Sequence, residues 1–210
     1  MIMKNLFIIL FSLCFISCTT EVTLAVQPDN SVTIKFDGGA GQAFTKMISS
    51  AAGMGGETEK SDNTENLIDT EVVSYELAKA GFSDVKISQK KGGSVSITMC
   101  DKKQSSYIFS SGIAKCEKGK LNAVITRKSL EDFYASADEQ TRMILDLFLA
   151  PVFNDEEMTE EEYIEMVSSF YGAGAAKEVG SSFVKINLIS KDGKKETLNY
   201  PLTQVFCGNF

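Results

Sequence analysis

The sequence contains no histidine and no tryptophan among its 210 residues, and only three prolines. Without histidine the chain has no Ser-His-Asp or Cys-His catalytic group, and it has no imidazole to bind zinc. The cysteines do not have metal-ligand spacing, and the glycine-rich segment 38–41 lacks the rest of a P-loop or dinucleotide pattern. We therefore expect no metal and no cofactor, and a protein that is not an enzyme.

The first 17 residues have the features of an export signal. Met1–Lys4 carries one positive charge, and Asn5–Ile16 consists almost entirely of apolar residues. This apolar run is shorter than the stretch of about 20 residues that a lasting membrane span needs. The segment 1–17 is therefore predicted to be a signal peptide.

The residues after the apolar run indicate what kind of signal it is. Phe15-Ile16-Ser17-Cys18 is followed by the polar Thr19-Thr20-Glu21. Here the chain resembles bacterial lipoprotein precursors, in which a small residue precedes the cysteine that becomes diacylated. Phe15 stands where the family usually has leucine, as in the relaxed lipoboxes of spirochaetes. The resemblance implies cleavage between Ser17 and Cys18 and attachment of palmitate-type acyl chains to Cys18. A plain secretory signal cut near Ser17 and an uncleaved anchor are the alternatives.

The net negative charge of the mature chain disfavours two classes of binding partner. Removal of residues 1–17 takes away one lysine and leaves 20 basic against 28 acidic residues, a net charge of −8. Such a charge disfavours binding to nucleic acid and electrostatic adhesion to anionic lipid. We therefore expect the lipid on Cys18 to hold the protein at a membrane of the cell envelope, with the choice between inner and outer membrane left open.

The mature chain is predicted to form one α+β domain over residues 21–210, preceded by a lipidated tether at 18–20 and containing a mobile loop at 52–66. Alternating apolar and polar residues predict β-hairpins in 22–36 and 184–200 and three or four antiparallel strands joined by tight turns in 85–126. Apolar residues at helical spacing predict helices in 69–80, 129–149 and 159–171. The expected architecture is an antiparallel sheet built from hairpins with helices packed on one face.

Several local assignments complete this prediction. Thr159 and Glu162 have the spacing of a capping box at a helix start. Tyr107–Phe109 is assigned to a strand, and 172–180 is assigned to a glycine-rich turn. The acidic cluster Asp155–Glu165 is interpreted as a solvated helix start and not as a calcium site, because the spacing of an EF-type loop is absent.

Three cysteines remain in the mature chain, namely Cys100, Cys116 and Cys207. An exported protein can oxidise, so a disulfide between Cys100 and Cys116 is one candidate. The alternative is three buried thiols that act as small apolar side chains. Cys207 has no histidine to activate it, and nothing in the sequence supports reactivity there.

The sequence leaves more than one functional hypothesis open. The first is a membrane-anchored lipoprotein that acts as a non-enzymatic interaction or assembly module for another envelope protein. The second is a lipoprotein that binds a lipid or a small apolar ligand, with a candidate apolar groove that includes Phe148 and Phe170. A third is a hydrolase that works without histidine, for which the sequence names no residues.

Overall fold

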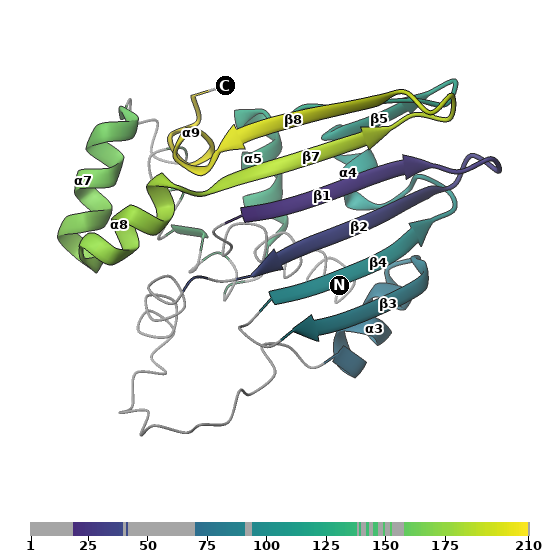
Figure 1. The fold of residues 1–210 in the computed structure, drawn as a ribbon, viewed down its shortest axis with the longest axis horizontal. Helices are drawn as coiled ribbons and strands as arrows, with labels where there is room; N and C mark the ends of the chain where they lie inside the picture. The colour runs from purple at the N-terminus through teal and green to yellow at the C-terminus, as the bar shows by residue number, and fades with distance from the viewer. Residues whose placement is uncertain are drawn as a thin grey trace.

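The computed structural model describes residues 19–39, 41, 70–90, 94–137, 139, 142, 145, 146, 149, 152 and 158–209 (Figure 1). Some of the predicted features lie outside these residues. They are the cleavage site at Ser17 and Cys18, the loop at 52–66, and Phe148.

A six-stranded sheet with the strand order β3-β4-β2-β1-β7-β8 forms the centre of the fold. Its strands are β1 (Thr19–Val26), β2 (Val32–Gly39), β3 (Ser83–Lys90), β4 (Ser94–Asp101), β7 (Phe183–Ile189) and β8 (Lys195–Pro201). The predicted α+β class is confirmed. The predicted hairpins at 22–36 and 184–200 correspond to the pairs β1–β2 and β7–β8, and the first two strands predicted within 85–126 form the pair β3–β4. One pairing, β1 with β7, is parallel, so the sheet is mixed.

The remaining elements lie in the long connections between the strands. A separate two-stranded sheet consists of β5 (Ala114–Glu117) and β6 (Lys120–Ala123). The helices are α3 (Thr70–Lys79), α4 (Tyr107–Ser110), α5 (Arg127–Ser136), α7 (Glu160–Tyr171), α8 (Ala173–Gly180) and α9 (Leu202–Cys207). Figure 1 shows α3, α4 and α5 behind the large sheet, and α7 and α8 at the end of the sheet where β1 and β7 begin. No helix of the described residues is both long enough and apolar enough to cross a membrane.

The hydrophobic core lies between the sheet and the helices behind it. Alternate residues of the central strands point into this core because successive side chains of a strand face opposite sides. The buried strand residues are Leu24, Val26, Val32, Ile34, Phe36, Val95, Ile97, Met99, Val184, Ile186 and Leu188. Leu77 of α3, Phe133 of α5, Val167 of α7 and Phe206 of α9 belong to the same core. The sequence pattern therefore assigns the inner face of each strand correctly.

Two local predictions are corrected by the structure, and one helix was not predicted. Tyr107–Phe109 belongs to helix α4 and not to a strand, because the carboxylate of Asp101 accepts hydrogen bonds from the backbone amides of Lys103, Ser105 and Ser106 and turns the chain. The segment 172–180 contains helix α8, which buries Ala175, Ala176 and Val179. Helix α9, at the end of the described chain, has no counterpart among the predicted elements.

The predicted capping box at the start of α7 is confirmed. The Thr159 hydroxyl accepts a hydrogen bond from the Glu162 backbone N–H at 3.2 Å, and the Glu162 carboxylate accepts one from the Thr159 backbone N–H at 2.8 Å. Hydrogen bonds from the Thr159 backbone and hydroxyl lower the pKa of Glu162. The acidic residues of this first turn thus stabilise the helix start.

Candidate functional site

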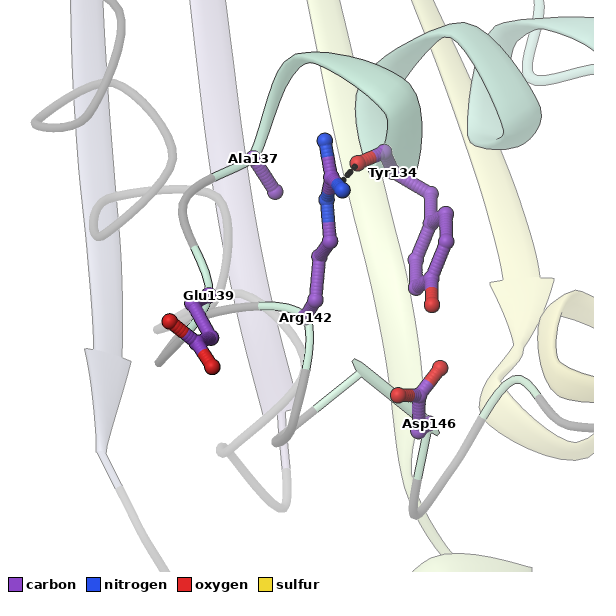
Figure 2. A pocket seen from close by; sticks show the side chains of 5 residues that line it. All are labelled: Tyr134, Ala137, Glu139, Arg142 and Asp146. Atoms are coloured by element: carbon purple, nitrogen blue, oxygen red, sulfur yellow. Dashed lines mark hydrogen bonds between the residues drawn. The ribbon is translucent and has the colours of Figure 1, made fainter.

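A cavity of about 680 Å³ lies at the end of α5 and is lined by Tyr134, Ala137, Glu139, Arg142 and Asp146 (Figure 2). Arg142 donates hydrogen bonds from Nε to the carbonyl of Tyr134 at 3.2 Å and from Nη2 to the carbonyl of Ala135 at 2.8 Å. These carbonyls belong to the last turn of α5, where the Tyr134 carbonyl also accepts a hydrogen bond from the Ala137 backbone N–H at 3.1 Å. Arg142 therefore caps the end of α5.

The other polar side chains of this cavity also contact each other. The guanidinium of Arg142 lies 5.6 Å from the centre of the Tyr134 ring, a cation–π distance. The pKa of Tyr134 is raised, first because its hydroxyl forms a hydrogen bond to the Asp146 carboxylate. The cavity thus holds a charged cluster that packs against the end of a helix, and among the described residues that line it the Tyr134 phenol is the only hydroxyl or thiol group.

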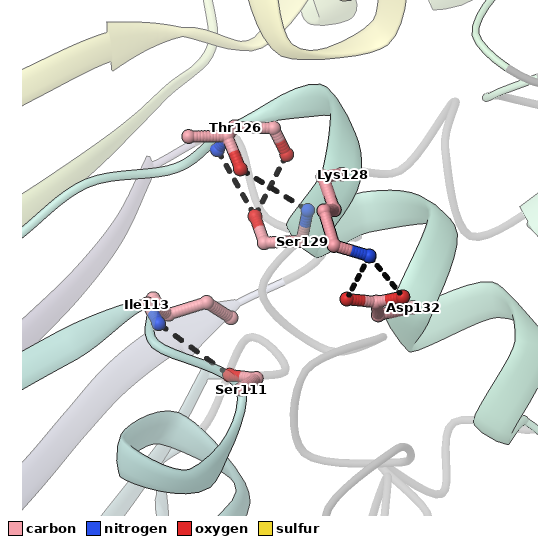
Figure 3. A network of polar contacts seen from close by, with 6 residues as sticks. All are labelled: Ser111, Ile113, Thr126, Lys128, Ser129 and Asp132. Atoms are coloured by element: carbon pink, nitrogen blue, oxygen red, sulfur yellow. Dashed lines mark hydrogen bonds and ion pairs between the residues drawn. The ribbon is translucent and has the colours of Figure 1, made fainter.

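A second polar network lies at the start of α5 (Figure 3). The Thr126 hydroxyl accepts from the Ser129 backbone N–H at 3.1 Å, and the Ser129 hydroxyl accepts from the Thr126 backbone N–H at 3.0 Å. The Ser129 hydroxyl also donates to the Thr126 carbonyl at 2.7 Å. Lys128 forms an ion pair with Asp132 one helical turn later. All of these contacts are local and fix the start of α5, so Ser129 is a capping residue.

The outer face of the large sheet carries a third polar network, which we call the β1–β7–β8 ladder and which consists of Glu21, Thr23, Lys185, Asn187 and Thr197. The Glu21 carboxylate accepts from Lys185 Nζ at 3.3 Å and from Asn187 Nδ2 at 2.5 Å. The Asn187 side chain also donates to Thr23 Oγ1 at 3.4 Å and accepts from Thr197 Oγ1 at 2.9 Å. The register places Glu21 beside Lys185, and Thr23 and Thr197 beside Asn187. The ladder therefore follows directly from the strand pairing.

No described helix covers the face that carries this ladder (Figure 1). The other polar side chains on this face of the central strands are exposed or only partly buried, for example Lys35 and Asp37 on β2 and Ser96 and Thr98 on β4. The sequence alone does not reveal the ladder, because its members from β1 and β7 are about 160 residues apart in the chain. The polar alternation along each strand was the available signal, but only the register identifies the partners.

No protein-family model matches this chain, and no curated protein or solved structure is significantly similar to it. Among the described residues, no three side chains of the metal-binding types gather at one place.

The three described cysteines carry free thiols. Cys100 lies on β4 of the large sheet, whereas Cys116 lies on β5 of the small sheet. The two strands belong to different sheets and do not pair, and the candidate disulfide between Cys100 and Cys116 stays a prediction.

Cys207 is the most protected of the three thiols. It is 3% exposed, and its Sγ donates to the Thr159 carbonyl at 3.8 Å. Burial, followed by the charges of Glu160 and Glu162, raises the pKa of Cys207 to about 11.

We predict that iodoacetamide at pH 8 alkylates Cys116 in the folded protein and reaches Cys207 only after denaturant is added, as peptide mass mapping would show. Equal labelling rates at the two cysteines in the folded protein would contradict this prediction.

The remaining predicted site residue, Phe170, lies on the surface. Its side chain is 76% exposed near the end of α7, and its ring centre lies 6.3 Å from that of Tyr171. Phe170 does not line the cavity of Figure 2.

At the other end of α7, Glu160 accepts a hydrogen bond from the Thr203 hydroxyl and so links α7 to α9.

Proposed function

We propose that the chain is a bacterial envelope lipoprotein that is anchored through Cys18 and acts as a non-enzymatic interaction or assembly module close to the membrane. The observation that carries this proposal is the position at which the first strand of the sheet begins. Strand β1 begins at Thr19, the residue that follows Cys18 in the sequence. Neighbouring Cα atoms are about 3.8 Å apart, so the proposed lipid site directly adjoins the sheet.

This short connection supports a function at the membrane surface. Two or three acyl chains anchor a protein stably, whereas one chain holds it only marginally. Because no residue lies between the proposed lipid site at Cys18 and β1, the folded domain has little freedom to leave the surface. Its partner would accordingly be a protein that is itself close to the bilayer.

The outer face of the sheet is the surface that we propose for this partner. The β1–β7–β8 ladder holds carboxylate, ammonium, amide and hydroxyl groups in a fixed arrangement across three strands. Such a face suits a polar protein surface that supplies complementary hydrogen bonds. The described cavity is lined mainly by charged and aromatic polar side chains, which favours the interaction module over a carrier of apolar ligands.

The proposal is tested by the intact mass of the full-length chain expressed in a bacterial host and purified from its membranes. We expect the mature protein to begin at Cys18 and to carry the added mass of a diacylglyceryl group and its acyl chains. A mature chain that begins at another residue, or one that begins at Cys18 without lipid, would overturn the proposed function.

A further inference from the structure

We infer that the domain meets the lipid bilayer with one defined end, on which the side chains of Phe170 and Phe183 enter the interfacial region. This inference rests on the proposed lipid anchor at Cys18 and adds the orientation of the domain on the membrane. The partner surface is thus the bilayer that holds the acyl chains.

The first observation is the position of Phe183. Phe183 is the first residue of β7, and the parallel register places it beside Thr19, the first residue of β1. Its side chain is 36% exposed, and its other neighbour in the sheet, Pro201 of β8, is also exposed. Phe183 therefore lies next to the point where the chain leaves the fold towards the proposed lipid.

The second observation is the position of Phe170. With 76% of its surface exposed, it is the most exposed large apolar side chain of the described residues. Phe170 lies in the last turn of α7, and α8 connects that turn to β7. Because α8 has only eight residues, it is about 12 Å long. Figure 1 accordingly shows α7 and α8 at the end of the sheet where β1 begins.

The distribution of charge distinguishes this end from the rest of an acidic protein. The segment 168–176, which joins α7 to α8, contains no charged residue, although its glycines and Phe170 are exposed. The acidic residues Glu160–Glu162 lie at the opposite end of α7, about 15 Å away along the helix. The exposed Lys177 follows the uncharged segment, where its long side chain can reach lipid phosphates.

These features together match the requirements of an interfacial contact. Aromatic side chains are enriched at the boundary between lipid headgroups and acyl chains, and their binding adds to that of covalently attached lipid. Single exposed apolar residues occur on many proteins, but here two exposed aromatic residues lie at the same end of the domain as the proposed attachment point. The polar ladder, on the broad face of the sheet, then remains available to a protein partner.

The absence of tryptophan from the sequence makes this orientation measurable. Three single-tryptophan variants are prepared as the lipidated full-length product, namely Phe170→Trp, Phe183→Trp and the control Tyr75→Trp. Tyr75 is 67% exposed on α3, which Figure 1 shows away from α7 and α8, beneath β3. Each variant is incorporated into phosphatidylcholine vesicles with and without brominated acyl chains, which quench tryptophan at short range. Circular dichroism shows whether each variant is folded. If the Phe183→Trp variant does not fold, because position 183 is only partly exposed, the Phe170→Trp variant tests the inference by itself.

We expect brominated lipid to reduce the tryptophan emission of the Phe170→Trp and Phe183→Trp variants at least twofold and to leave that of the Tyr75→Trp control unchanged. Emission that is unchanged in all three variants, or quenched equally in all three, would overturn the inference while lipid on Cys18 still supports the anchor. A mass spectrum of the same samples without lipid on Cys18 would overturn the proposed function and this inference together.

Discussion

Replacement of Cys18 by serine is expected to abolish acylation and to move the protein out of the membrane fraction. The lipid is attached to the sulfur of cysteine in the lipoprotein family that this segment resembles, and serine offers no thiol in its place. Each buried CH₂ group of an acyl chain contributes about 0.8 kcal/mol to membrane binding. Loss of all chains should therefore lower membrane partitioning by several orders of magnitude. The measurement is immunoblotting of membrane and soluble fractions, together with metabolic labelling by a fatty acid.

Cys14 provides a matched control for this substitution. Cys14 lies four residues before Cys18 and follows the bulky Leu13, so it does not fit the cleavage pattern. The Cys14→Ser variant should retain full labelling and full membrane association. If the wild-type chain itself keeps residues 1–17 without lipid and the Cys18→Ser variant partitions like it, the segment 1–17 acts as an uncleaved anchor and the lipoprotein hypothesis is wrong.

Sequence patterns predicted the elements that depend on neighbouring residues. The hairpin of β7 and β8 turns at Asp192-Gly193, where Gly193 has a positive φ of 83° that glycine adopts without strain. The capping box of Thr159 and Glu162 marked the start of α7 to the residue. In both cases the decisive interactions span only a few positions, so the sequence contains all the information that is needed.

The features that the sequence did not reveal depend on distant contacts. The parallel pairing of β1 with β7 joins segments separated by the whole length of the domain, and parallel strands require a long crossover. Helix α8 was obscured because Gly172, Gly174 and Gly180 disfavour helix in isolation, whereas packing against α7 stabilises it. The β1–β7–β8 ladder could not be inferred before this pairing was known.

Asp101 illustrates how one buried side chain redirects the chain. It is 2% exposed, and it ends β4 where the sequence pattern indicated further strands. Its Oδ1 accepts from the backbone N–H groups of Lys103 at 3.1 Å and Ser105 at 3.2 Å, and its Oδ2 accepts from that of Ser106 at 2.8 Å. Within this loop Gln104 adopts a positive φ of 51°, which a residue with a side chain rarely adopts. The carboxylate thus stabilises an otherwise unfavourable turn that leads into α4.

Replacement of Asp101 by alanine should therefore lower the free energy of unfolding by about 3 kcal/mol, because it leaves three backbone donors without their acceptor and one of them is buried. Asp101→Asn keeps one acceptor oxygen and should cost roughly half as much. The control Asp132→Ala removes an exposed carboxylate whose partner is Lys128, and its effect should be about 0.5 kcal/mol or less. Urea unfolding of the three variants measures these differences. Equal midpoints for the alanine variants at positions 101 and 132 would mean that the Asp101 carboxylate does not hold this turn.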